Sequence, residues 1–461
     1  MSETTPTTDA IRPAPGRPLS ILMAIGPGIV VSGSVIGSGE LINTPIQATL
    51  FGFALLWAVI LSCVIKYFLQ VEIGRHCLVH NRTTIEALNL CPGPKVRGTS
   101  WVGLAYMVCY TVALASVPGM LVAIAGLLHA VMPLGSDATV STDAWAVIVC
   151  VLTFVLLWHG LYSELEKLVA LLVVGFSLSV VVALFLLQGT SYRVTGEEVE
   201  SGLRFSLGPH NPRQAAFAVI SLLGALGTTA SELFMYPYWI LEKGYGRFVG
   251  RQDGPGWVDR ARGWVRVLQV DAGACTLVAT VITAAYFLMG AAILHRGHLV
   301  PSGSAVVHQL SAVFTRVYGD WSYLLFMFGA FCTLYSTVVV VAAATGRMWA
   351  DVLSSVKLLD GGDERARRRY HRLFQSLCLL GSLGVALGLR QPPERLVMFG
   401  QYVNGLFGTP LLMAAICWIA FRTDRRVRMN WVMAILLVAS VAAIAVCLAV
   451  GVLLQAGLIR T

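Results

Sequence analysis

The feature that most constrains this chain is a series of apolar runs long enough to cross a lipid bilayer. Runs of about 18 or more apolar residues, the length of a membrane-spanning helix, recur to the end of the sequence. Only 12% of the 461 residues are charged, against about 25% in soluble domains. The sequence therefore predicts an all-α membrane protein that crosses the lipid bilayer many times.

Eleven membrane spans are predicted. They cover residues 19–50, 52–75, 101–132, 144–158, 165–187, 214–241, 267–294, 323–348, 373–389, 396–421 and 431–458. The first would be roughly 48 Å long as one helix, whereas the hydrocarbon core is about 30 Å thick. We therefore expect the first span to be tilted or broken, with the break at Gly37, Ser38 and Gly39. The third span is expected to bend near Pro118 and Gly119.

One stretch of the first span returns later in the chain. Residues 33–45 contain three glycines within seven residues and then Glu40, and residues 229–237 repeat the pattern around Glu232. Both copies read small-small-Glu-Leu, with a proline five residues after the glutamate. Glycine disfavours a helix, and a carboxylate at membrane depth is usually functional. Two interrupted spans in corresponding positions indicate the binding site of a transporter.

The positions of the two breaks predict the organisation of the chain. With the first and sixth spans broken, the spans divide as five plus five plus one. An odd repeat length makes the second copy insert upside down, which gives an inverted-topology repeat. The predicted parts are a disordered cytosolic tail (1–18), the first repeat (19–187), an extracytoplasmic connection (188–213), the second repeat (214–421) and the eleventh helix (422–461).

The basic residues predict the orientation. Most of them fall in the loops after the second, sixth, eighth and tenth spans, and few fall after the first and third. The positive-inside rule then puts the N-terminus in the cytosol and the C-terminus outside the cell, in the plasma membrane. The same distribution explains the net charge of +9 without a nucleic-acid partner.

Glu40 and Glu232 are the main candidates for the substrate site. In the repeat arrangement both carboxylates point into one cavity near the middle of the membrane, beside unwound backbone carbonyls. Hard divalent cations prefer such oxygen ligands. Two close carboxylates do not both stay ionised without a cation, so cation binding should compete with protons. The alternative is that each glutamate only caps the N-terminus of a half-helix.

Six further residues complete the predicted metal site, and each has a structural alternative. Gly37 and Ser38 offer backbone groups at the first break, or form a hinge. Thr229 and Ser231 offer hydroxyls, or bond back to their own helix. Gln401 and Asn404, three residues apart on one helix face, offer amide oxygens, or bond to a neighbouring helix.

The remaining polar residues have simpler interpretations. Lys66, Glu72 and Arg75 are expected to pair or to extend to the membrane surface, and Met235 to pack in the core. Residues 305–318 are expected to form a surface helix. The ten cysteines show no CxxC pair and read as core residues. No Walker loop, nucleophile elbow or HExxH motif is present, so we expect no enzyme activity, no ATP and no cofactor.

Stretches in the first, second, sixth, eighth and tenth spans resemble the Nramp family of divalent-metal transporters, and the chain is similar to a divergent member of that family. The second-span text from Leu55, Leu56 and Trp57 through residues 65–75 is the most specific match. Weaker matches are Gly26-Pro27-Gly28, Leu226-Gly227-Thr228-Thr229, Glu242-Lys243-Gly244, Tyr335-Ser336-Thr337 and Gly400-Gln401. The resemblance implies a LeuT-like fold and import of manganese, iron or a related divalent ion by alternating access.

The chain departs from the family pattern at the site itself. The family usually has Asp-Pro-Gly-Asn in the first helix, where this chain has Gly37-Ser38-Gly39-Glu40, and Met-Pro-His in the sixth, where Ser231 and Glu232 stand. Losing that methionine opens Mg²⁺ as a substrate. The third span has no acidic residue, so proton coupling by the family's usual path is not supported. Gln401 does match the tenth-helix glutamine that the family uses for metal.

A second resemblance leaves another substrate class open. Residues 33–39 are also similar to the first helix of amino-acid and polyamine transporters, whose glycine amides hold a substrate carboxylate. With two glutamates nearby, an amine-bearing solute is the alternative substrate. A third hypothesis is a membrane sensor that binds a ligand without transporting it.

Overall fold

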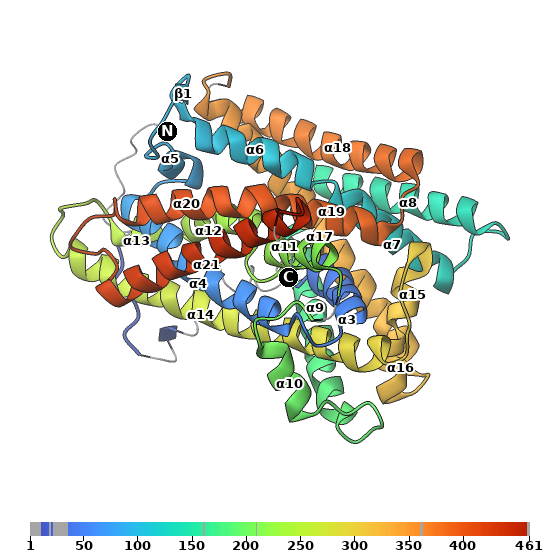
Figure 1. The fold of residues 1–461 in the computed structure, drawn as a ribbon. Helices are drawn as coiled ribbons and strands as arrows, with labels where there is room; N and C mark the ends of the chain where they lie inside the picture. Colours follow the sequence, from blue (N-terminus) through green and yellow to red (C-terminus); the bar gives the residue numbers. More distant parts are fainter. Residues whose placement is uncertain are drawn as a thin grey trace.

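The computed structural model describes residues 11–17, 20–21, 36–159, 162–208, 210–359 and 363–458. Almost every element in this part of the chain is a helix, and Figure 1 shows the long helices side by side in one bundle. A single hairpin, β1 (Lys95–Val96) and β2 (Thr99–Ser100), pairs Lys95 with Ser100 in an antiparallel register. The chain is therefore all-α, as predicted.

The helices begin and end at the following residues. They are η2 (Gly39–Asn43), α3 (Thr44–Phe51), α4 (Leu56–His80), α5 (Thr84–Leu88), α6 (Trp101–Ala113), α7 (Ser116–Val131), α8 (Ala138–Trp158), α9 (Tyr162–Leu187), α10 (Gly196–Leu203), α11 (Pro212–Ala225), α12 (Ala230–Glu242), α13 (Tyr245–Val249), α14 (Trp257–Met289), η3 (Gly290–His295), η4 (Gly303–Ala305), α15 (Val306–Leu310), α16 (Ala312–Tyr318), α17 (Ser322–Ser355), α18 (Glu364–Leu389), α19 (Pro393–Val403), η5 (Asn404–Gly408), α20 (Thr409–Ala420) and α21 (Trp431–Gln455).

Within the described residues, nine helices are long and apolar enough to cross a membrane. Some of them join two elements, such as α11 with α12 and α19 with α20. A shorter apolar segment, Leu171–Leu187, lies in α9. Of the first predicted span, residues 20–21 and 36–50 are described, so residues 33–35 lie outside the described part. The chain is a multi-pass membrane protein, and the total of eleven spans stays a prediction.

Burial separates the inner helices from those that face lipid. In the most apolar window of α11 and α12, 83% of residues are buried, against 28% in α8, α18 and α21. A helix that exposes apolar side chains on this scale needs lipid around it. The interrupted span formed by α11 and α12 therefore lies at the centre of the bundle.

The second break is confirmed. Helix α11 ends at Ala225 and α12 begins at Ala230, with Leu226 and Thr229 in extended conformations. Gly227 between them has a φ of +65°, a conformation that glycine adopts without strain. At the predicted first break, Ile36 and Gly37 form a bend, and a helix begins at Ser38.

Two other predictions on secondary structure can be compared with the structure. The third span is interrupted as predicted, at Leu114 and Ala115 between α6 and α7, three residues before Pro118 in the first turn of α7. The prediction for residues 305–318 needs correction. Residues 305–318 form α15 and α16 with Val306, Val307 and Phe314 buried. They are therefore not one surface helix, because their apolar side chains pack into the core.

Tight glycine contacts hold the tenth span against the sixth. A Cβ atom added at Gly224 would lie 2.0 Å from the Gln401 carbonyl oxygen, and one at Gly405 would lie 2.1 Å from the Ile220 carbonyl oxygen. Small residues let membrane helices approach closely in this way. The contact fixes Gln401 beside the second break.

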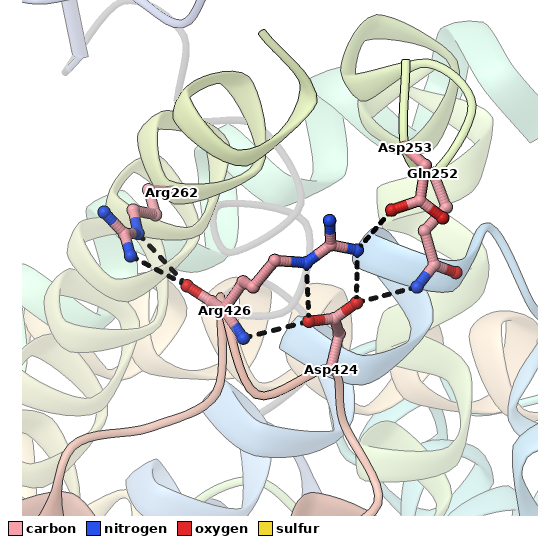
Figure 2. Close-up of polar contacts among 5 residues, drawn as sticks. All are labelled: Gln252, Asp253, Arg262, Asp424 and Arg426. Atoms are coloured by element: carbon pink, nitrogen blue, oxygen red, sulfur yellow. Dashed lines mark hydrogen bonds and ion pairs between the residues drawn. The ribbon is translucent and has the colours of Figure 1, made fainter. Parts of the chain in front are cut away.

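A polar cluster joins two loops at one end of the bundle, as Figure 2 shows. The Arg426 guanidinium donates to Asp424 at 2.8 Å and to Asp253 at 2.6 Å, and Gln252 donates to Asp424 at 2.7 Å. Arg262 donates to the Arg426 carbonyl at 2.9 Å. The segment between α13 and α14 is thereby tied to the connection between α20 and α21. The guanidinium also holds the pKa of Asp424 well below its usual range.

We predict that the stability contributed by Asp424 does not change between about pH 7 and about pH 5. Because the folded-state pKa of Asp424 is depressed, its contribution is fully present above the usual Asp pKa of about 3.9 and is lost only as pH falls through the lower folded value. Asp424→Asn should therefore lower the melting temperature by the same amount at about pH 7 and about pH 5. A thermal-shift series checks this.

The matched control is Asp143→Asn, which removes a carboxylate from the exposed pair with Arg390. Exposed pairs contribute little, so this variant should melt close to the wild type. An Asp424→Asn deficit that vanished between those two pH values would contradict the prediction.

Candidate functional site

A cavity of about 120 Å³ lies where the two breaks meet, and all eight predicted site residues line it. They are Gly37, Ser38, Glu40, Thr229, Ser231, Glu232, Gln401 and Asn404. The space is several times the roughly 30 Å³ that one water takes in the liquid. It can therefore hold a cation together with some of its water. The role of these residues as metal ligands stays a prediction.

Glu40 is held in place at the first break. One carboxylate oxygen accepts the Gly37 N–H at 2.9 Å, and the other accepts the Thr283 hydroxyl at 3.3 Å. The side chain is 1% exposed. Next to it, a Cβ atom added at Gly39 would lie 3.1 Å from the Ala225 carbonyl oxygen at the end of α11. The two breaks are thus in direct contact.

Glu232 is held at the second break by a capping box. Its carboxylate accepts the Thr229 N–H at 2.7 Å, and the Thr229 hydroxyl accepts the Glu232 N–H at 3.4 Å. The Thr229 hydroxyl also lies 3.0 Å from that of Ser231. Glu40 bonds to a backbone N–H three residues before it in the same way. Both glutamates therefore cap a half-helix and line the cavity at once, so the capping alternative and the ligand role are compatible.

The two amides from the tenth span differ. Asn404 donates to the Gly224 carbonyl at 2.8 Å, which is the interhelical bond of the structural alternative. Gln401 donates to the Ser38 hydroxyl at 3.4 Å. Its carbonyl oxygen is buried and has no hydrogen-bond partner within the described residues. Buried polar atoms are nearly always paired, so this oxygen is suited to a bound cation.

A polar stripe on α4 supports the second break. Ser62, Lys66 and Gln70 are spaced by four residues and so share one helix face. Ser62 donates to the Leu226 carbonyl at 3.0 Å, the Lys66 ammonium donates to the same oxygen, and Gln70 accepts the Thr228 hydroxyl at 2.7 Å. These contacts satisfy the backbone and side-chain groups that the interruption leaves without helical partners.

The prediction that Lys66 extends to the membrane surface is wrong. Its side chain is 0% exposed, and its ammonium lies at the C-terminal end of α11, where the helix dipole favours a cation. Glu72 and Arg75 do pair, at 3.0 Å. The sequence contains a signal for the role of Lys66, because polar residues at four-residue intervals in an apolar helix indicate a buried polar face.

The donor set of the cavity consists mainly of oxygen atoms. Among the described residues, no group of three or more His, Cys, Asp or Glu side chains is placed to hold a metal. The available donors are two carboxylates, one amide oxygen, hydroxyls and break carbonyls, which suit hard cations. Met235, also in the wall, adds a soft thioether. Its side chain packs in the core, as predicted, and it also borders the cavity.

A helix interrupted between α11 and α12 and a bend at Gly37 meet at a cavity that two carboxylates line, an arrangement typical of one class of membrane transporters. The fold is similar to the manganese transporter of Eremococcus coleocola in complex with an aromatic bis-isothiourea substituted compound. The TM-score is 0.63 at 14% identity, covering 99% of this chain and 90% of that one. It is also similar to MhsT in complex with L-phenylalanine, with a TM-score of 0.58 at 14% identity, covering 96% and 100%. The LeuT-like fold is thereby confirmed.

The chain belongs to the Nramp family, because the family model "Natural resistance-associated macrophage protein-like" matches residues 28–455. The resemblance found in the sequence is thus confirmed. Comparison with the curated proteins gives no match.

We predict that Gly227→Ala disrupts the second break. The substitution forces a non-glycine residue to a φ of +65° and puts a Cβ atom 2.8 Å from the Cys63 Cα atom of α4. Backbone strain of this kind costs about 1–3 kcal/mol, and the clash with α4 adds to it. The melting temperature of the purified protein should fall.

Gly135→Ala is the matched control, since Gly135 has a φ of +90° but no atom within 4 Å of the added Cβ. It carries the backbone strain without the clash. Equal losses in the two variants would show that packing of the break on α4 contributes nothing.

Proposed function

We propose that this Nramp-family protein is a secondary transporter that imports a divalent cation by alternating access. The observation that carries the proposal is that Glu40 and Glu232, one from each predicted repeat, line one cavity at two touching helix breaks. Two carboxylates supply the charge that a divalent ion needs. The Gln401 oxygen and the hydroxyls at the breaks replace part of the ion's water shell.

The identity of the ion depends on which donors it uses. Oxygen donors alone serve Mg²⁺ and Mn²⁺, while a thioether favours the softer transition metals. Met235 lines the cavity, and its thioether would favour transition metals over Mg²⁺. We expect Mn²⁺ and Fe²⁺ as substrates and Mg²⁺ as a competitor.

The orientation proposed is an N-terminus in the cytosol and a C-terminus outside. Arginines cluster in and around α13, at the start of α18 and just before α21, for example Arg247, Arg365 and Arg425. This bias supports a cytosolic position for that end of the bundle. In Figure 1, α13 and β1 lie at the left end of the bundle and α15 and α16 at the right.

The alternative substrate is an amine-bearing solute. The cavity wall also contains Trp239, Met120 and Val341, which suit an organic substrate. MhsT, which shares the fold, was solved with L-phenylalanine. Calorimetry with metals and with amino acids or polyamines separates the two functions.

Glu232→Gln tests the ligand role against the capping role. Glutamine serves in a capping box as glutamate does, so the helix should still form. The charge is lost, so Mn²⁺ uptake into proteoliposomes should fall by about a hundredfold or more, which corresponds to about 2.7 kcal/mol. Glu40→Gln should give the same loss.

The control is Glu86→Gln, because Glu86 closes the same kind of capping box with Thr83 on α5 but lies outside the cavity. Its uptake should match the wild type. Normal uptake by Glu232→Gln, in a protein that melts like the wild type, would leave capping as the only role.

Lys66→Met tests the charge of the site. Lys66 adds one positive charge near the two carboxylates. Its removal should therefore strengthen the binding of a divalent cation. A change of one charge in a partly screened interior is worth about 1–2 kcal/mol, or about tenfold in Kd. Calorimetry should show tighter Mn²⁺ binding in Lys66→Met and near-normal binding in Lys66→Arg. Weaker binding in a folded Lys66→Met would contradict this.

A further inference from the structure

A second cavity, a groove of about 700 Å³, lies between the end of α8 and the first turns of α18. Its wall is formed by Trp158, Leu373, Ser376 and the four arginines Arg365, Arg368, Arg369 and Arg372. The two helices contact each other below it, where the Cys150 thiol lies 3.6 Å from the Leu379 carbonyl oxygen. Figure 1 shows α18 along the outer edge of the bundle. The groove is therefore on the surface, apart from the transport cavity.

The arginines converge because of their spacing. Arg365, Arg369, Arg372 and Ser376 follow one another at intervals of four, three and four residues, which keeps them on one face of a helix. In the sequence these residues indicate only the orientation of the chain. The structure adds that they share one concave surface.

Among the carboxylates that the structure describes, few lie close enough to neutralise this positive charge. Arg368 lies 3.5 Å from Glu364, with both side chains exposed. Arg367, which is outside the groove, pairs with Asp351. Within the part of the chain that the structure describes, Arg365, Arg369 and Arg372 form no ion pair with a carboxylate. Such a cluster attracts an anion, and guanidinium groups match phosphate oxygens in a bidentate way.

Trp158 marks the depth of the groove in the membrane. The Arg372 guanidinium lies 4.9 Å from the centre of the Trp158 ring, within cation–π range. The indole is 43% exposed at the end of α8. Tryptophan at the end of a membrane helix is typical of the headgroup level.

Below the arginines both helices expose apolar side chains. On α8 these are Leu152 and Val155, and on α18 they are Leu377 and Leu380, each between 43% and 58% exposed. An anion with hydrocarbon chains would therefore find charge at the groove and apolar contact beneath it. Free phosphate would contact only the arginines and not the apolar side chains beneath them.

We propose that this groove binds the phosphate headgroup of an anionic membrane phospholipid, with the acyl chains against α8 and α18. Basic pockets between membrane helices are suited to such headgroups. The bound lipid would bridge the fourth and ninth predicted spans. The proposal does not depend on the identity of the transported substrate.

The test uses the full-length protein, purified and stripped of lipid in a neutral detergent. Melting temperatures are measured with phosphatidylglycerol, with phosphatidylcholine of the same chains, and with inorganic phosphate. Native mass spectrometry counts the lipids retained. Phosphatidylglycerol should stabilise the protein more than either other addition. Arg369→Gln with Arg372→Gln should lose at least half of that gain and of the retained lipid.

The control is Arg425→Gln with Arg428→Gln, which removes two exposed arginines from the connection between α20 and α21. This double variant should show the same rise in melting temperature with phosphatidylglycerol, and the same retained lipid, as the wild type. Equal stabilisation by the two lipids would overturn the proposal, as would a gain unchanged in the Arg369 and Arg372 double variant. An equal effect of inorganic phosphate would assign the groove to a free anion instead.

Discussion

The structure depends on how it satisfies the backbone groups that two helix breaks expose inside a membrane. Where there is no water, every N–H and C=O group needs a partner within the protein. Glu40 and Glu232 accept backbone N–H groups at the starts of the two half-helices. On the other side of the second break, Lys66 and Ser62 donate to the Leu226 carbonyl. The groups that make the breaks possible are therefore charged, and this puts charge at the centre of the protein.

Charge at that position explains why the cavity suits a cation. Two buried carboxylates repel each other, and a single ammonium offsets only one of them. A divalent cation compensates the remaining negative charge, and the Gln401 carbonyl oxygen, which has no hydrogen-bond partner among the described residues, is a further ligand for it. Close glycine contacts at Gly39, Gly224 and Gly405 bring these groups together. The close packing of these glycines therefore also determines how near the charged groups of the two breaks lie to each other.

The sequence predicted the parts of this arrangement that follow from local rules. Glycines beside a glutamate in an apolar run predicted the first break, and the repeat of the small-small-Glu-Leu pattern predicted the second break and a shared cavity for both glutamates. The environment of Lys66 was not predicted, because its partner is a carbonyl 160 residues away. The packing of Val306 and Phe314 into the core was missed for the same reason. Long-range contacts of this kind are not encoded in residue spacing.

The central claim is that a divalent cation binds between Glu40 and Glu232. Crystals of the protein grown with Mn²⁺ and measured at an energy where manganese scatters anomalously test it most directly. We expect one anomalous peak in the cavity, about 2.0–2.6 Å from oxygens of Glu40, Glu232 and Gln401, because hard cations lie at such distances from their oxygen ligands. A cavity without a peak in crystals that hold manganese elsewhere would contradict the account.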